Sequence, residues 1–175
     1  MTAPEFSLPI ALDTLGEVPR QIEIEAGEAE RAGLARRFSL PDISALTAAM
    51  TLVRSGDLIT ATGRIEATVT QSCIASGAPV AARIVEAFSI EFRRMPDGAA
   101  PDDEAELGED ELDVVFYEGA SIDIGEAAAE TLALALDPYP RAPDADAALK
   151  VAGVKGEEEA GPFAALASLR GKLKP

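Results

Sequence analysis

The sequence predicts an α+β fold: an antiparallel β-sheet of four to six strands packed with two main helices, plus a short C-terminal helix. Three observations support this prediction. Around residues 45–93, apolar and polar residues alternate in three successive runs with the two-residue period of half-buried strands. Residues 27–38 and 123–136 instead have the spacing of amphipathic helices. A length of 175 residues suits a single domain.

The first elements precede the meander. Residues 6–12 and 21–26 are expected to be extended, and in the second run Ile22 and Ile24 alternate with glutamates. The helix expected at residues 27–38 places Leu34 and Phe38 one turn apart. Pro41 then breaks this helical pattern.

The meander consists of three strands joined by short turns. The first covers residues 46–53, where a helix remains the alternative. The second, after the turn at Gly56, is the clearest, and Gly63 on its apolar face predicts a bulge or a close backbone approach. The third covers residues 84–92 and follows a loop that contains Cys73.

Beyond the meander, residues 97–112 predict a mobile acidic loop, because the segment 102–113 holds eight acids and no base. A short strand is expected at residues 114–117. The second helix begins at Asp123, where a capping box is predicted: Asp123 accepts from amides of the first turn, and Glu126 reaches back three residues. Pro138 ends this helix.

The domain prediction places a single domain at residues 1–150, a linker at 151–161 and an amphipathic segment at 162–175. In the last segment Phe163, Leu166 and Leu169 share one helical face. Two interpretations remain open. The face packs back on its own domain or frays, or it docks in a groove of a partner.

The charge of the chain is unevenly distributed. Residues 1–96 hold 12 acids and 9 arginines, whereas residues 97–175 hold 19 acids and 6 bases, for a net charge of −16. A field of this sign repels phosphate backbones and attracts basic proteins. We therefore expect no DNA binding and a basic protein partner.

The chain has few of the residue types that usually act in catalysis. The chain has no histidine and one cysteine, so histidine-based triads and conventional zinc sites are excluded within it. It also lacks a glycine-rich phosphate loop. Cys73 has no base among its sequence neighbours and is interpreted as structural, with a nucleophile or redox sensor as the alternative. We expect no catalytic, cofactor or metal residue and no enzyme activity.

Three acids of the second helix, Asp123, Glu126 and Glu130, fall on one face. They are interpreted as a cap with solvent-facing acids, and an acid or metal cluster is the alternative. The first residues lack the basic and apolar regions of a signal peptide, and no apolar run reaches the length of a membrane span, about 20 residues. A cytoplasmic protein with no membrane contact is expected.

Several segments in order resemble the YceD family, also called DUF177, which is linked to accumulation of large-subunit ribosomal RNA. The matching residues lie in three blocks, Val69–Cys73 with Pro79, Phe88 and Phe92, then Ile122–Ile124 with Glu126, Glu130, Leu132 and Pro138, then Gly161–Leu166 with Leu169. Many members have a second cysteine in the central turn, where this chain has Ser76. The chain therefore resembles a metal-free branch associated with alphaproteobacteria, and the resemblance implies no cofactor.

The resemblance implies a role in processing, stability or accumulation of 23S ribosomal RNA. The hypothesis is an acidic adaptor that binds a basic ribosomal or assembly protein and associates with the RNA only indirectly. The candidate partner-binding residues are Asp123, Glu126, Glu130, Phe163, Leu166 and Leu169. One rival is direct RNA binding by the arginines at 31, 36, 37, 64, 83, 93 and 94. Another is a carboxylate enzyme that uses magnesium.

Overall fold

The computed structural model describes residues 4–95 and 113–154. These residues form two compact units. One holds the described residues up to Gln71 together with Ala81–Asp137, and the other holds Ser72–Val80 together with residues 138–154. The predicted loop at 97–112, the segment 162–175 and residues 155–161 of the predicted linker lie outside the described residues. The domain boundary placed at residue 150 stays a prediction.

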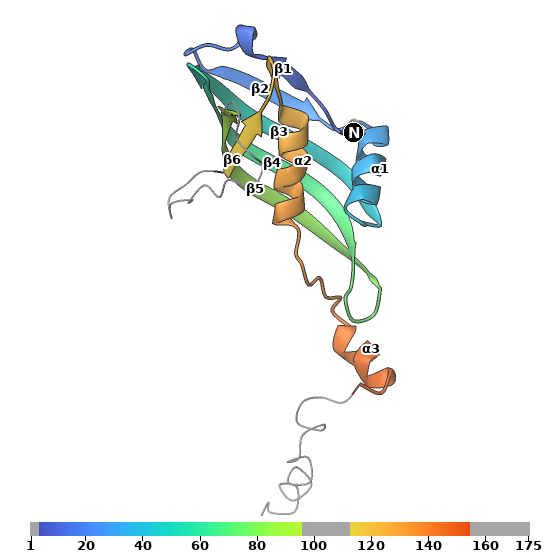
Figure 1. Cartoon of the computed structure of the whole chain (residues 1–175). Helices are drawn as coiled ribbons and strands as arrows, with labels where there is room; N and C mark the ends of the chain where they lie inside the picture. Colours follow the sequence, from blue (N-terminus) through green and yellow to red (C-terminus); the bar gives the residue numbers. More distant parts are fainter. Residues whose placement is uncertain (1–3, 96–112, 155–175) are drawn as a thin grey trace, which may run out of the picture. The chain divides into compact units, whose positions relative to one another are not determined.

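The predicted α+β class is confirmed, since two sheets and several helices make up the described residues (Figure 1). In chain order the elements are β1 (Pro9–Ala11), the 3-10 turn η1 (Leu12–Thr14), β2 (Arg20–Glu25), α1 (Glu28–Arg37), β3 (Asp42–Ser55), β4 (Leu58–Ser72), β5 (Pro79–Arg94), β6 (Asp113–Tyr117), β7 (Ser121–Asp123), α2 (Ile124–Ala135) and α3 (Ala145–Val151).

The larger sheet has the strand order β2-β3-β4-β5-β6. Its first strands are antiparallel, with Ile22 opposite Met50 and Met50 opposite Gly63. The predicted meander is thus confirmed, and the alternative of a helix at residues 46–53 is wrong. The β3–β4 register shifts between Ile43 and Ala45, where the strands bulge.

The last strand of this sheet differs from the antiparallel expectation. β6 runs parallel to β5, from Asp113 opposite Ile90 to Tyr117 opposite Arg94. A parallel neighbour requires a crossover of a dozen or more residues, and residues 95–112 supply that length. Tyr117 is buried, and its hydroxyl donates to the carbonyl of Asp57 at 2.9 Å, which anchors β6 to the β3–β4 turn.

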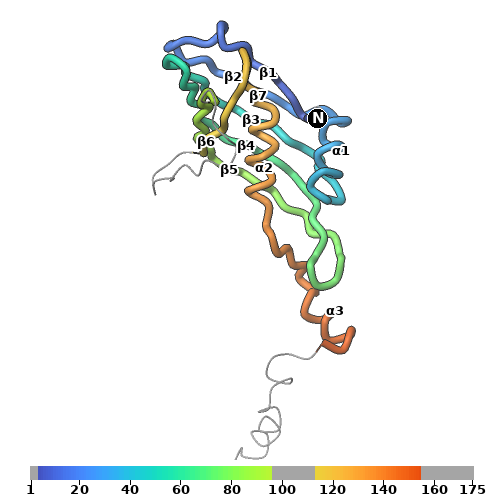
Figure 2. The backbone as a smooth tube through the Cα atoms, in the orientation of Figure 1, coloured from blue at the N-terminus to red at the C-terminus, as the bar shows by residue number. Residues whose placement is uncertain are grey.

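A second, two-stranded sheet joins residues that are distant in sequence. β1 pairs with β7 in antiparallel register, with Pro9 opposite Asp123, and the tube in Figure 2 shows the two strands side by side. The extended segment expected at residues 6–12 forms a strand only over Pro9–Ala11, because Leu12 begins the 3-10 turn. β7 leads directly into α2, so this small sheet fixes the start of that helix.

Both helices of the larger unit contribute to one hydrophobic core on one face of the large sheet. Leu34 of α1 and Leu132 of α2 are fully buried in the same cluster as the inward side chains of β3, β4 and β5. A buried leucine contributes about 1.5–3 kcal/mol relative to an exposed one, so these contacts hold the helices on the sheet. The opposite face of β2–β5 carries no buried side chain among the described residues. We call this surface the open face.

Gly63 confirms the predicted close approach of two backbones. A Cβ atom built at Gly63 would clash with the carbonyl oxygen of Ala49 and lie 2.7 Å from the Cα atom of Met50. Real Cβ atoms essentially never come that close to backbone, so only glycine fits at this point of β4.

Candidate partner-binding surface

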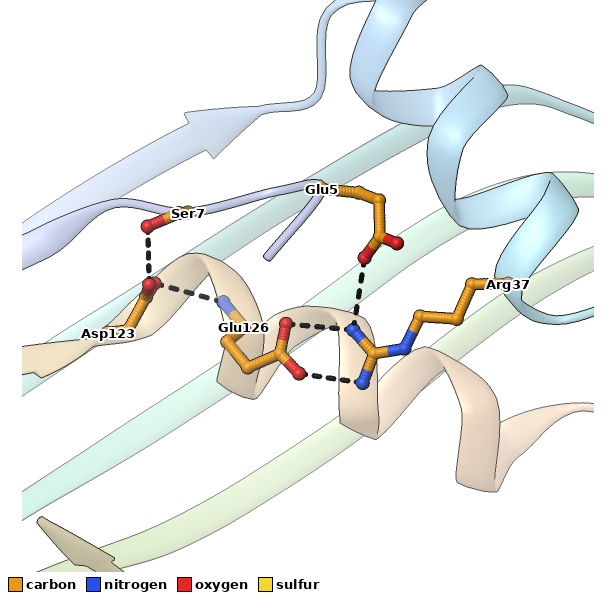
Figure 3. Close-up of polar contacts among 5 residues, drawn as sticks. All are labelled: Glu5, Ser7, Arg37, Asp123 and Glu126. Atoms are coloured by element: carbon orange, nitrogen blue, oxygen red, sulfur yellow. Dashed lines mark hydrogen bonds and ion pairs between the residues drawn. The ribbon is translucent and has the colours of Figure 1, made fainter. Parts of the chain in front are cut away.

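Asp123 is the N-cap of α2 and also holds the N-terminal segment. Its Oδ1 atom accepts from the backbone N–H groups of Gly125 at 3.0 Å and Glu126 at 3.1 Å. The same atom accepts from the N–H of Leu8 at 2.9 Å. Ser7 Oγ donates to Oδ2 at 2.5 Å, as Figure 3 shows. The predicted capping role is confirmed, and the carboxylate is occupied by groups of its own chain.

The second half of the predicted capping box is wrong. Glu126 does not turn back to the cap; its carboxylate accepts hydrogen bonds from two guanidinium N–H groups of Arg37, at 2.9 and 2.7 Å (Figure 3). Glu5 lies 3.4 Å from the same guanidinium. Hydrogen bonding to Glu126 is the main reason why the pKa of Arg37 is raised above its ordinary value. A carboxylate accepts two charge-assisted hydrogen bonds from a forked guanidinium but only one neutral hydrogen bond from a backbone N–H, which explains why Glu126 binds Arg37.

Glu130 is the candidate acid of α2 whose side chain faces solvent. Partial burial, followed by the neighbouring charge of Glu126, raises the pKa of its carboxyl above the usual range. The three predicted acids therefore do not form one surface. Asp123 and Glu126 belong to an internal network with Ser7 and Arg37, whereas Glu130 remains available for another molecule. Phe163, Leu166 and Leu169 lie outside the described residues.

The arginines of the RNA-binding rival are largely matched by carboxylates. Arg64 and Arg83 both contact Glu66, at 2.8 and 3.1 Å. Arg93 lies 2.6 Å from Glu91. Together with Arg37, four of the seven arginines make ion pairs on elements that include α1, β4 and β5. In this part of the chain the pairing interrupts the continuous basic surface that the rival requires.

The open face is hollowed beside the edge of the sheet. A depression of about 430 Å³ is lined by Glu23, Ile24, Glu25, Thr47, Ala48, Ala49, Arg64 and Glu66. A neighbouring one of about 460 Å³ extends toward Thr62 and Ala87. Small and β-branched side chains form the floor, and charged side chains stand at the rim. Sequence reasoning missed this surface, although the alternation of Glu23 and Glu25 with isoleucines already placed both carboxylates on the open face.

Cys73 lies in the smaller unit, in a core with Ala142 and Ala145. The thiol is buried. A hydrogen bond from the backbone of Ala142 and one from the side chain of Ser76 favour the thiolate and lower the pKa of Cys73 to about 7. The backbone N–H of Ile74 donates to the carbonyl of Pro140 at 2.9 Å. The structural interpretation of this cysteine and its alternative, a nucleophile or redox sensor, both stay predictions.

Two further observations bear on function. Within residues 4–95 and 113–154, no three His, Cys, Asp or Glu side chains are grouped in a way that could hold a metal ion. Among the helices that the structure describes, none has the length and apolar character that crossing a bilayer requires.

Comparison with known proteins gives one match. A family model described as large ribosomal RNA subunit accumulation protein YceD matches residues 61–170. The matched range includes most of β4, all of β5 and β6, and all of α2 and α3, so it covers part of the larger unit and the described residues of the smaller one. Searches of curated proteins and of solved structures found no match.

Proposed function

Since this chain belongs to the YceD family, described as large ribosomal RNA subunit accumulation proteins, we propose that it supports accumulation of 23S ribosomal RNA as a non-enzymatic adaptor. The adaptor binds a basic ribosomal or ribosome-assembly protein in the cytoplasm. The observation that carries this proposal is the charge of the chain, 31 acids against 15 bases. Such a field attracts basic proteins and repels the phosphates of RNA.

The ion pairs of the arginines favour an adaptor over direct RNA binding. A protein that neutralises phosphates must offer several unpaired cations on one surface, because each phosphate contact releases counterions. Arg64, Arg83 and Arg93 are instead paired with glutamates on the open face. RNA would have to compete with these carboxylates, whereas a basic protein would not.

The candidate residues contribute unequally to this proposal. Glu130 is exposed and can contact a cationic partner. Asp123 and Glu126 already hold Leu8 and Arg37, so substituting them changes the fold as well as the surface. The contribution of Phe163, Leu166 and Leu169 as an apolar contact with the same partner stays a prediction.

The proposal is tested by capturing the tagged full chain from cells of its source, with and without nuclease, and identifying the captured proteins by mass spectrometry. We expect one or a few basic ribosomal or assembly proteins to remain after RNA is digested. If all such proteins disappear with the RNA, the chain contacts RNA and the adaptor role is wrong. A Glu130→Lys variant is expected to capture less of the partner, and Glu118→Lys, which makes the same charge change at another exposed acid, serves as its control.

A further inference from the structure

The outer edge of the large sheet is formed by β2. Among the described residues β2 pairs only with β3, since it is the first strand in the order β2-β3-β4-β5-β6. Every second backbone N–H and C=O of β2 therefore points away from the sheet without a strand to receive it. Such an edge is a template for another extended chain.

The side chains of β2 define which chain fits. Ile22 and Ile24 turn toward the core and are half-buried, while Glu23 and Glu25 are exposed on the open face. No described cation lies within salt-bridge distance of either carboxylate. The two glutamates are two residues apart, about 7 Å along the strand. Alternate residues of an added strand have the same spacing, so each carboxylate would lie opposite one residue of that strand.

The hollow beside this edge lies on the inner side of β2, over β3 and β4. Glu23 and Glu25 form one wall, and Thr47 and Ala49 of β3 form the floor. On the far side Glu66 is bound by Arg64 and Arg83. The unpaired negative charge is thus concentrated next to the free edge. A strand added outside β2 would lie one strand spacing, about 4.8 Å, from it, so long cationic side chains can reach the carboxylates of Glu23 and Glu25.

Building on the proposed adaptor function, we propose that the β2 edge, with the carboxylates of Glu23 and Glu25, is the docking site for an extended, lysine- or arginine-bearing segment of the protein partner. The segment adds a strand to β2 through backbone hydrogen bonds, and its cations pair with Glu23 and Glu25. Backbone pairing supplies affinity that does not depend on sequence, and the two carboxylates select for positive charge.

Two other occupants of the edge have to be considered. A second copy of the chain would bring its own Glu23 and Glu25 against those of the first, and like charges on adjacent strands repel. The segment 162–175 of the same chain carries Arg170, Lys172 and Lys174 and no acid, so it has the right charge for the site. Both occupants are therefore outcomes that the test must separate from a protein partner.

The test uses the full chain and a fluorescent peptide of alternating lysine and valine, with binding followed by anisotropy. We expect saturable binding that weakens about ten-fold in the double variant Glu23→Gln/Glu25→Gln, because two exposed ion pairs are lost. Glu86→Gln/Glu118→Gln removes the same charge from exposed sites elsewhere and is expected to bind like wild type. The same peptide with alternate backbone nitrogens methylated keeps its charge but cannot pair with an edge, so it is expected to lose most of its affinity.

Several results would overturn the inference. Equal affinity for wild type and Glu23→Gln/Glu25→Gln, or full binding by the methylated peptide, would show that net charge alone attracts the probe. Peptide binding seen only after residues 162–175 are removed would assign the edge to the tail of the chain. Sedimentation showing a dimer that Glu23→Gln/Glu25→Gln strengthens and that excludes the peptide would assign it to a second copy.

Capture from cells separates failure of this site from failure of the proposed function. If wild type and Glu23→Gln/Glu25→Gln retain the same basic ribosomal protein after nuclease, the adaptor role stands and the β2 site is wrong. If wild type retains none, the adaptor role is wrong, and the peptide measurements still decide whether the edge binds basic segments.

Discussion

The pKa of Cys73 is lowered although no basic side chain is among the causes. Its thiolate is favoured by hydrogen bonds from the backbone of Ala142 and the side chain of Ser76, against a penalty from burial. Since the pKa in the folded chain is depressed, the stabilisation is present above the ordinary thiol pKa of about 8.5 and is lost as the pH falls through the folded value. Ionisation of this buried thiol therefore makes stability depend on pH.

The first prediction concerns this thiol. A titration followed by the ultraviolet absorbance of the thiolate should give a midpoint for Cys73 at about pH 7. In Ser76→Ala the midpoint should move toward 8.5, because one donor to the thiolate is removed. Cys73→Ser supplies the baseline, since the chain has no other cysteine. A midpoint that is the same in wild type and Ser76→Ala would contradict the role given to that hydroxyl.

The second prediction concerns Glu130, whose pKa is shifted upward, whereas that of Cys73 is shifted downward. Its carboxyl pKa is raised, first by burial and then by Glu126, so the charged form is unfavourable in the folded chain. The contribution of the protonated carboxyl to the free energy of unfolding is complete below the ordinary carboxyl pKa. It is lost as the pH rises through the pKa of Glu130 in the folded chain. Glu130→Gln should therefore raise the free energy of unfolding at pH 7 by a few tenths of a kcal/mol, a small gain because solvent screens the site.

Denaturant unfolding of Glu130→Gln and wild type at two pH values checks this sign. The two proteins should have equal stability below the carboxyl range, where wild type is protonated. Glu118→Gln, at an exposed acid outside the helix, serves as the control at both values. A Glu130→Gln protein that is less stable than wild type at neutral pH would show that the carboxylate makes a favourable contact.

At the scale of elements, the two helices of the core are joined by the ion pair between Arg37 and Glu126. The side chains of Arg37 and Glu126 are 34% and 23% exposed, so the pair is screened less than one at the surface. In a double-mutant cycle with Arg37→Ala and Glu126→Ala, we expect a coupling free energy of about 1 kcal/mol. Additive effects in the double variant would show that the pair contributes nothing to joining α1 and α2.

The fourth prediction tests the close approach of the β3 and β4 backbones at Gly63. A methyl group there would press on the backbone of Ala49 and Met50, so Gly63→Ala should lower the free energy of unfolding by about 2 kcal/mol or more. Gly16→Ala is the matched control, because a Cβ at that position would meet nothing within 4 Å. Denaturant midpoints of the two variants give the comparison. Unchanged stability in Gly63→Ala would mean that β3 and β4 can separate at no cost.

The periodic pattern of apolar and polar residues predicted those strands and helices that are long enough to show a repeat. The alternation at residues 46–53 and 59–69 identified β3 and β4, and helical spacing identified α1 and α2. β7 has three residues, too few to display a period, and the parallel direction of β6 depends on tertiary folding. The partner of Glu126 could not be predicted either, because Arg37 is 89 residues away along the chain. The same limit applies to β2, whose isolation at the edge follows from the strand order.

At the scale of the whole molecule, charge decides which partners are compatible. The chain has a net charge of −16, and four of the ten arginines in the described residues, Arg37, Arg64, Arg83 and Arg93, pair with its own glutamates. Attraction to cationic proteins extends over about a Debye length, 8 Å at physiological salt, and therefore guides encounter more than it fixes a complex. The docking site must then supply short-range contacts, and the β2 edge offers backbone groups together with two carboxylates.

The ratio of 23S to 16S ribosomal RNA in cells depleted of the chain tests most directly whether binding through an acidic surface supports accumulation of the large ribosomal RNA. Depletion should lower the ratio. Re-expressed wild type and Glu86→Gln/Glu118→Gln should restore it, whereas Glu23→Gln/Glu25→Gln, produced at the same level, should not. A ratio that stays unchanged on depletion, or that Glu23→Gln/Glu25→Gln restores in full, would contradict this role of the acidic surface.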